Sequence, residues 1–349
     1  MSVKRVAIHT VSVANSNKGG SRATRKSRTA SGCEFVSFCV QSGYAVNDIG
    51  KVNAVWLAAW IAHLKSRHLS TATINNKVAS VRALAAARGQ DMKKTGLRDS
   101  AALGLDKRCR RGTKEPITDD KFSDVIQKAM ALGEIGFAHM IRLERLLGLR
   151  GLEALMSTYA LLTYAKQARA ILGPRHDEIH ISDGTKGGRP RHVAVISKYA
   201  QETFSAILDA LAFAQKNDGF LIQGKPGTGL VGARRRYHRI ATTVGLVGVF
   251  APHSLRYRYA VDKLIELRDS GVPRNEALAL TSQWLGHSGS RGRFISLVYG
   301  TAVTRSYPKT NRLQNIKKAL VELNCISENL DPLSLHWPAS DVRRIRQNE

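Results

Sequence analysis

The sequence predicts a mainly α-helical protein with one small antiparallel β-sheet, an α+β fold. Apolar residues recur at spacings of three and four in several stretches, which is typical of amphipathic helices. Residues 178–195 instead contain two short β-type segments around a glycine-rich turn, as in a hairpin. With 349 residues, 43% of them hydrophobic, the chain is long enough to bury a sizeable core and to form two or three domains.

The first third of the chain predicts one small all-helical domain over residues 31–106. A weak helical pattern covers residues 24–43, and residues 52–64 have a wide apolar face at helical spacing. Ser70 is placed to cap the next helix, and Gly89 ends it. Because these short helices are rich in Lys and Arg, we expect a compact basic module.

The first 30 residues are basic and contain no acidic side chain. Seven Lys or Arg residues lie among Ser, Thr and Gly before Glu34, the first acidic residue. This composition fits a transit peptide or a basic arm that lies along DNA. A secretory signal is excluded because no continuous apolar run is present. Our interpretation is a basic arm over residues 1–30.

The overall charge indicates a polyanionic partner. Fifty-four Lys and Arg against 27 Asp and Glu give a formal charge of +27 and a pI near 10.4, so double-stranded DNA is the first candidate. An anionic membrane is the second, but no apolar run approaches the roughly 20 residues of a spanning helix, and we expect no membrane association. The cysteines form no C-x-x-C pair, which fits a reducing cytoplasm: Cys33, Cys39, Cys109 and Cys325.

A polar, basic segment separates the helical domain from a second domain that begins with a helix at Thr118. We interpret this segment as an interdomain linker in which Lys107, Arg110 and Arg111 lie against a DNA backbone. The end of the chain is expected to hold an amphipathic helix and a loose basic tail. The predicted linker, second domain and C-terminal segment are residues 107–116, 117–308 and 309–349.

The stretch from Pro252 to Tyr299 contains side chains suited to phosphate chemistry. Residues three apart on a helix share a face, so His253 and Arg256 point the same way. A guanidinium grips two oxygens of a phosphate, and an imidazole can pass a proton at neutral pH. His287, in Leu-Gly-His, adds a second imidazole, and Tyr299, at the end of the stretch, adds a phenol that can attack phosphorus.

Two upstream elements complete this set. Arg150 and Glu153 lie one helical turn apart in Gly-Leu-Arg-Gly-Leu-Glu, and Lys186 lies in the glycine-rich turn of the predicted hairpin. Taken alone, the first pair would be a surface ion pair worth a few tenths of a kcal/mol. A lysine beside Gly-Gly is usually only a solvated turn residue. The interpretation therefore depends on their occurrence together with the downstream stretch.

The order of these motifs resembles the catalytic end of the tyrosine recombinases, the phage integrase family. The resemblance covers roughly residues 30–305 and implies a helical core-binding domain followed by a tyrosine recombinase catalytic domain. The catalytic residues that it implies are Arg150, Glu153, Lys186, His253, Arg256, His287 and Tyr299.

The resemblance also implies a role for each of these residues. Both arginines and His287 bind the non-bridging oxygens of the scissile phosphate, and Glu153 holds the first arginine in place. Lys186 is the general acid for the leaving 5′ oxygen, and His253 handles a proton at the tyrosine or at phosphate. Tyr299 is the nucleophile and forms a covalent 3′-phosphotyrosyl intermediate. Because that linkage conserves bond energy, we expect no cofactor and no metal.

One departure concerns the nucleophile. His287 and Tyr299 are 12 residues apart, which is longer than the spacing usual in the family, and residues 288–293 form the apparent insertion. Tyr307, followed by Pro308, is the competing nucleophile. The sequence favours Tyr299 but leaves this alternative open.

A basic helix is predicted directly after a glycine-rich stretch. Residues 227–232 fit G-x-G-x-x-G, but Pro226 breaks the strand-to-turn geometry and no acid follows about 20 residues on, so dinucleotide binding is disfavoured. We expect the helix to follow DNA phosphates instead. Its candidate DNA-binding residues are Arg234, Arg235, Arg236 and Arg239.

The leading hypothesis is a site-specific recombinase of a mobile element, acting as a tetramer on two DNA sites at the nucleoid of a prokaryotic or mobile-element host. Accessory DNA-bending or directionality proteins are expected further partners. A type IB topoisomerase or a telomere resolvase shares the nucleophile but differs in the outcome on supercoiled or hairpin substrates. A DNA-binding regulator that retains the fold without chemistry is the third alternative. The complete residue set argues against the regulator, because binding alone needs no phenol beside the arginines.

Overall fold

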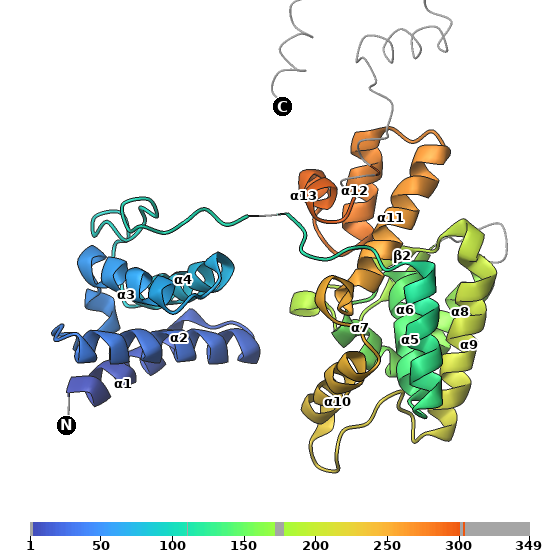
Figure 1. The fold of residues 1–349 in the computed structure, drawn as a ribbon, viewed down its shortest axis with the longest axis horizontal. Coiled ribbons are helices and arrows are strands. Elements are labelled where there is room, and N and C mark those ends of the chain that lie inside the picture. The colour runs from blue at the N-terminus through green and yellow to red at the C-terminus, as the bar shows by residue number, and fades with distance from the viewer. Residues whose placement is uncertain (1–2, 110, 172–177, 301–302, 304–349) are drawn as a thin grey trace, which may run out of the picture.

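The computed structural model describes residues 3–109, 111–171, 178–300 and 303. These residues form two helical bodies joined by an extended segment (Figure 1), and each body has its own buried apolar cluster. The described part of the chain contains thirteen α-helices and a sheet of two antiparallel strands. The predicted fold class, mainly α with a small antiparallel sheet, is confirmed.

Four helices build the N-terminal body. At the start of three of them, the side chain of Ser21, Asn53 or Ser70 accepts a hydrogen bond from a backbone N–H that would otherwise lack a partner. The core includes Phe35 and Trp60, whose ring centroids lie 5.2 Å apart in an edge-to-face arrangement. The helices are α1 (Val3–Lys18), α2 (Arg22–Gln41), α3 (Ala54–Ser66) and α4 (Thr71–Ala87).

The first helix differs from the basic arm expected over residues 1–30. Ala7 and Val11 lie one turn apart on α1 and are fully buried in the core of the N-terminal body. Gly32 of α2 allows the close packing, because a Cβ there would lie 2.8 Å from Val11 and 2.6 Å from Leu84 of α4. The many basic residues of this stretch obscure a short apolar stripe in the sequence. Because that stripe packs into the core, α1 is part of the helical bundle.

Nine of the described helices and both strands form the C-terminal body. Helices α5, α6, α9 and α8 lie side by side (Figure 1), and α7, α11, α12 and the hairpin meet at the edge of this layer. The strands pair with Ile179 opposite Val193, as the predicted hairpin requires. The elements are α5 (Asp119–Ala131), α6 (Ile135–Leu147), α7 (Gly151–Met156), α8 (Leu161–Ile171), β1 (Glu178–Ile181), β2 (Arg191–Ala194), α9 (Ala200–Lys216), α10 (Gly229–Thr243), α11 (His253–Asp269), α12 (Arg274–Trp284) and α13 (Gly292–Val298).

The extended segment between the bodies contacts the end of α13. The backbone N–H of Gly112 donates to the carbonyl of Leu297 at 3.4 Å, and Lys114 Nζ donates to the carbonyl of Gly248 at 2.6 Å. A Cβ at Gly112 would lie 2.3 Å from the carbonyl oxygen of Val298, so only glycine fits there without movement. The linker therefore touches the helix that ends at the candidate nucleophile.

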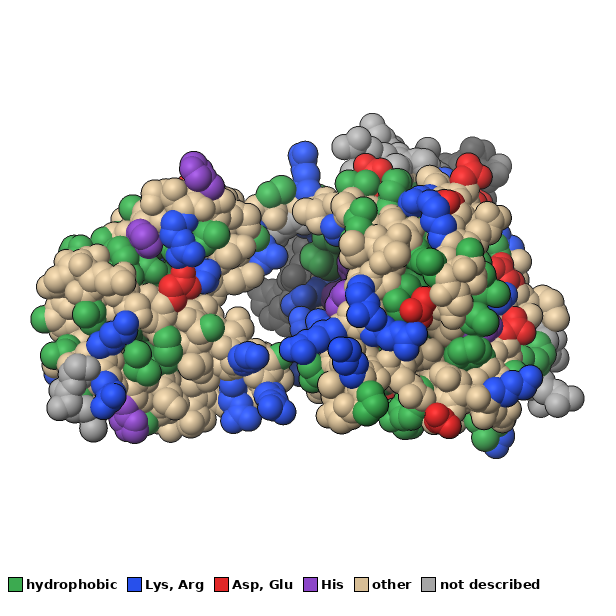
Figure 2. Space-filling model, turned by 60° about the horizontal axis from the view of Figure 1, so that its bottom comes forward, with side chains coloured by type: hydrophobic (Ala, Val, Ile, Leu, Met, Phe, Trp, Pro, Cys, Tyr) green, Lys and Arg blue, Asp and Glu red, His purple; other side chains and the backbone are tan. Residues whose placement is uncertain are grey.

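Basic side chains gather around the opening between the two bodies (Figure 2). Among the described residues, no helix has both the length and the apolar content needed to cross a membrane. The predicted C-terminal segment, residues 309–349, lies outside the described residues, as does Tyr307. Their assignments stay predictions.

Candidate active site

Arg150 lies where one helix ends and the next begins. Gly148 closes α6 in the left-handed conformation (φ 56°), which favours glycine. Arg150 is the N-cap of α7, and its backbone N–H donates to Oε2 of Glu153 at 2.8 Å. The Arg150 guanidinium donates to the other carboxylate oxygen. Both bonds run from Arg150 to the Glu153 carboxylate, which thus holds the backbone and the side chain of Arg150 in place.

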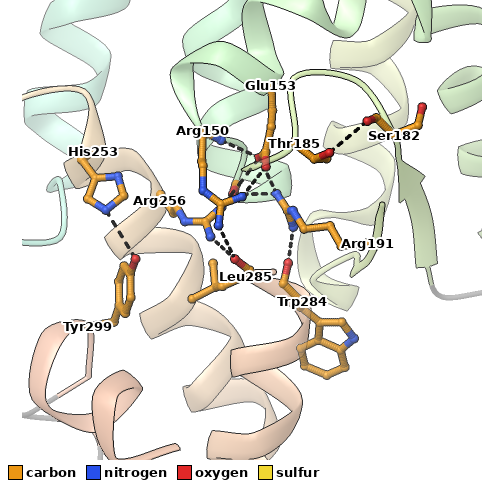
Figure 3. A network of polar contacts seen from close by, with 11 residues as sticks. Arg150, Glu153, Ser182, Thr185, Arg191, His253, Arg256, Trp284, Leu285 and Tyr299 are labelled. Carbon is orange, nitrogen blue, oxygen red and sulfur yellow. Dashed lines mark hydrogen bonds and ion pairs between the residues drawn. The ribbon is translucent and has the colours of Figure 1, made fainter. Parts of the chain in front are cut away.

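Three guanidiniums surround the carboxylate of Glu153 (Figure 3). Arg191 Nη2 donates to Oε2 at 2.7 Å, and Arg256 Nη1 lies 3.8 Å from the same oxygen. Burial alone would raise the pKa of Glu153, but the charges of Arg191, Arg256 and Arg150 outweigh it and lower the pKa to about 2. One buried negative charge therefore faces three positive charges, and a net positive charge remains.

The Leu-Gly-His motif joins the two predicted arginines. The carbonyl of Leu285 accepts a hydrogen bond from Arg150 Nη2 at 3.0 Å and another from Arg256 Nη2 (Figure 3). Gly286 has a positive φ of 66°, and a Cβ there would lie 2.8 Å from Cδ of Arg191. The glycine of the motif thus lets this carbonyl approach the guanidiniums.

Tyr299 points toward His253 (Figure 3), with 3.4 Å between the phenol oxygen and Nε2. The tyrosine is the C-cap of α13 and is only 6% exposed. The ring of Tyr257 packs against it with 4.6 Å between centroids, and the His253 ring lies at 6.0 Å. A short 3₁₀ turn, Gly289–Arg291, takes up half of the apparent insertion, and the last two residues of the insertion begin α13. The 12-residue spacing therefore still brings the two side chains together.

Both predicted histidines are neutral at pH 7. Burial of the His253 imidazole, then the charges of Arg256, Arg150 and Lys114, lower its pKa to about 4, although part of its side chain reaches solvent. Burial and the same two arginines also lower the pKa of His287 to about 4. A neutral His253 can accept a proton from a phenol, and a bound phosphate would raise its basicity by offsetting the nearby positive charges.

Two family models match the chain. The model described as "Integrase" matches residues 104–262, and the one described as "Phage integrase, N-terminal" matches residues 3–94. The chain belongs to the tyrosine recombinase (phage integrase) family. The match over residues 3–94 includes α1, in agreement with the packing of that helix in the N-terminal body.

Two solved structures are similar to this chain. The Tn1549 transposon integrase in complex with transposon right end DNA matches with a TM-score of 0.50 and 14% identity, covering 93% of this chain and 100% of that chain. The XerH site-specific recombinase bound to palindromic difH substrate has a TM-score of 0.48 and 17% identity, covering 86% of this chain and 80% of that chain. At 14% identity the Tn1549 match supports the fold alone. No curated protein matches this chain.

The other predicted residues lie around this cluster. Lys186 is exposed on the hairpin turn, and its charge is among those that lower the pKa of His287. Lys107 and Arg111 are exposed on the linker, and Arg111 lines a hollow of about 410 Å³ together with Tyr299. Arg110 lies outside the described residues.

The predicted basic helix is α10. Arg235, Arg236 and Arg239 line a hollow of about 490 Å³ together with Lys225. Arg236 also pairs with Glu134 at 2.8 Å, which leaves it less free for a phosphate. Arg234 is exposed on the same helix. The four predicted DNA-binding arginines thus lie together, but one of them has an acidic partner.

Sequence reasoning missed Arg191 and Glu144. Arg191 follows the glycine-rich turn of the predicted hairpin and was given no role, yet it is buried on the same face of β2 as Val193. The two-residue period of the strand was the signal that could have placed it inside. Glu144 is one acid within the apolar helix α6, and no sequence feature distinguishes it from a surface residue. In the structure it is buried and accepts a hydrogen bond from Tyr237 at 2.7 Å.

Glu144 predicts a pH dependence of stability. Burial, with a smaller contribution from Glu153, raises the pKa of Glu144 to about 8, so the folded protein holds its proton more tightly than the unfolded chain. Its contribution to the free energy of unfolding is greatest at low pH and falls as the pH rises from about 4.3 to about 8. Glu144→Gln should remove this part, so the Tm of the variant should rise relative to that of wild type from pH 5 to about pH 8 and change little above that. Thermal unfolding of both proteins between pH 5 and pH 9 measures this difference in Tm. The exposed Glu202→Gln is the control, and equal pH profiles for wild type and Glu144→Gln would contradict the assignment.

Proposed function

We propose that this chain is a site-specific recombinase that cuts and rejoins DNA through a covalent 3′-phosphotyrosyl intermediate. The observation that supports it most is the convergence of four segments on one place. The Tyr299 hydroxyl lies 3.4 Å from His253, while Arg150 and Arg256 share one carbonyl acceptor. A regulator that only binds DNA would not need this phenol beside a phosphate-binding pair.

The charge balance of the site favours a phosphate. Glu153 only partly offsets the guanidiniums around it, so they repel one another in the free protein. Buried polar atoms without a partner among the described residues include Arg256 Nε and His287 Nε2. A phosphodiester would relieve the repulsion, and a pentacovalent transition state with more negative charge would relieve it further. This difference in binding is what accelerates the chemical step.

A residue of the site is assigned to each step of the proposed reaction. The Tyr299 oxygen attacks phosphorus, its proton passes to His253, and the bond to the 5′ oxygen breaks as Lys186 protonates that oxygen. The products are a 3′-phosphotyrosyl linkage and a free 5′-hydroxyl, and the reverse reaction with another strand completes exchange. Arg150, Arg256 and His287 would hold the non-bridging oxygens. No metal or cofactor takes part in this proposal.

The proposed partner is double-stranded DNA, bound by a tetramer on two sites during movement of a mobile element. The formal charge of +27 and the basic side chains around the opening between the bodies support DNA binding. The mobile-element role is part of the proposal, and the transposon integrase solved with transposon DNA shares the fold of this chain.

Capture of covalently bound DNA tests this function. The wild-type chain should become attached to a defined sequence in a library of nicked suicide duplexes, and two copies of that sequence on a plasmid should recombine. Relaxation of a supercoiled plasmid without any defined site would favour the topoisomerase alternative. Binding without any adduct would favour the inactive regulator.

DNA binding through α10 predicts a salt dependence. Arg235→Ala and Arg239→Ala should each weaken binding to specific and unrelated DNA alike, and should each reduce the slope of log K against log salt by about 0.9. The measurement is fluorescence anisotropy between 50 and 300 mM salt, and the exposed Lys216→Ala on α9 is the matched control. Unchanged slopes in both arginine variants would contradict the placement of DNA along α10.

A further inference from the structure

Arg191 is a buried arginine in an otherwise exposed basic turn. It is the first residue of β2 and only 6% exposed, whereas Lys186 and Arg189 of the same hairpin are exposed. Burying a guanidinium is unfavourable unless its donors find acceptors. The acceptors of Arg191 therefore indicate what the residue does.

These acceptors lie on three separate segments (Figure 3). Arg191 Nη1 donates to the carbonyl of Trp284, which lies three residues before His287. Its Nη2 donates to the carbonyl of Gly148 at 3.2 Å and to Oε2 of Glu153 at 2.7 Å. One side chain of the hairpin thus binds the end of α12, the loop before Arg150 and the carboxylate of α7.

The hairpin turn is held at both of its ends. At the near end, Gly184 lies so close to α7 that a Cβ would be 2.6 Å from the carbonyl oxygen of Leu152. At the far end, Arg191 makes the contacts just described. Between them, Gly187 and Gly188 have φ of 74° and 67°, and the N–H of Gly188 donates to the carbonyl of Thr185 at 3.1 Å, so the turn that carries Lys186 is a short unit placed against the site by its two ends. The position of Lys186 therefore depends on these two attachments.

Arg191 is poorly placed to bind DNA directly. Both terminal nitrogens already donate within the protein, and its Nε is buried with no partner among the residues that the structure describes. Arg150 differs because 22% of its side chain is exposed. Arg256 is as buried as Arg191 and also donates to two carbonyls, but it lies 3.8 Å from Glu153, whereas Arg191 is bonded to that carboxylate at 2.7 Å and its charge is therefore offset more fully. An effect of Arg191 on the reaction would accordingly act through other residues.

We propose that Arg191 is a positioning residue that holds the hairpin against the arginine pair, so that Lys186 reaches the leaving 5′ oxygen. The inference rests on the proposed function, because it assumes the general-acid role of Lys186. In that step the Tyr299 oxygen bonds to phosphorus, the bond from phosphorus to the 5′ oxygen breaks, and the Lys186 ammonium gives a proton to that oxygen. Loss of Arg191 should therefore impair leaving-group protonation more than phosphate binding.

A substrate with sulfur in place of the bridging 5′ oxygen tests this inference, because a thiolate leaves without being protonated. At saturating DNA, Lys186→Ala should slow adduct formation on the oxygen substrate by about 10²-fold or more and regain most of the rate on the sulfur substrate. Arg191→Gln should show the same pattern, with at least a tenfold loss on oxygen. The double variant should be no slower on oxygen than Lys186→Ala alone. The exposed Arg189→Gln should match wild type on both substrates.

Each other outcome has a defined meaning. If Arg191→Gln is equally slow on both substrates while the sulfur substrate rescues Lys186→Ala, the inference about Arg191 is wrong. The proposed function is unaffected by that result. Lys186→Ala that is not rescued overturns the general-acid role, and the inference with it. A wild-type protein without any adduct overturns the proposed function itself. If Arg191→Gln does not fold, Arg191→Lys replaces it, since it keeps the charge but cannot bind all three acceptors, and the same comparison decides.

Discussion

Tyr299→Phe is expected to bind DNA as wild type does and to form no covalent adduct. The substitution removes one oxygen from a ring packed against Tyr257 and His253, so the fold should remain. The rate of adduct formation on a nicked suicide duplex should fall by at least about 10⁴-fold, because the nucleophile itself is absent. Gel separation of protein–DNA adducts measures the rate, and anisotropy measures binding.

Tyr307→Phe is the matched control for this experiment. It lies beyond the described residues, follows the same helix in the sequence and was the competing nucleophile in the sequence analysis. The account expects it to form the adduct at close to the wild-type rate. An adduct that persists in Tyr299→Phe and disappears in Tyr307→Phe would move the nucleophile to Tyr307.

Glu153→Gln is expected to cause a large loss of stability. The buried carboxylate contacts Arg150 and Arg191 directly and lies 3.8 Å from Arg256. Removing its charge leaves three guanidiniums without their shared anion, and breaking a buried ion pair in this way costs about 3–5 kcal/mol. Urea unfolding at pH 7 should show this loss. Adduct formation should also fall, because the arginines lose their fixed positions.

The pH dependence of this loss gives a second check. Because the folded pKa of Glu153 is about 2, its stabilising contribution is fully present above the unfolded pKa, near 4.3, and is lost as the pH falls toward 2. The difference in unfolding free energy between wild type and Glu153→Gln should therefore shrink between pH 5 and pH 2.5. A difference that stays constant over this range would show that the charge of Glu153 does not stabilise the fold. The exposed Glu202→Gln should give no difference at any pH.

Local sequence signals predicted much of the fold and of the candidate site. The caps at Ser70 and Thr118 accept the expected backbone hydrogen bonds, and the hairpin has the expected strands. The roles of the site residues stay predictions, but the side chains from Arg150 to Tyr299 do meet in space. Helix and turn signals depend on residues close in the sequence, so they can be recognised without the structure.

What the sequence did not reveal depends on tertiary packing. The burial of α1 relies on Gly32, which lies on another helix, and on Leu84 of a third. Arg191 becomes a central residue only because three distant segments present acceptors to it. Glu144 keeps its proton only because the core surrounds it. Propensity and motif spacing contain no information about such long-range contacts.

The attachment point of DNA on the protein tests the central claim most directly. After reaction with a suicide duplex, the adduct should be digested with protease and nuclease and sequenced by mass spectrometry. The account predicts one modified peptide, with a nucleotide linked through its 3′ phosphate to Tyr299, and a free 5′-hydroxyl on the released strand. A nucleotide on Tyr307 or any other residue, or a linkage through a 5′ phosphate, would contradict it.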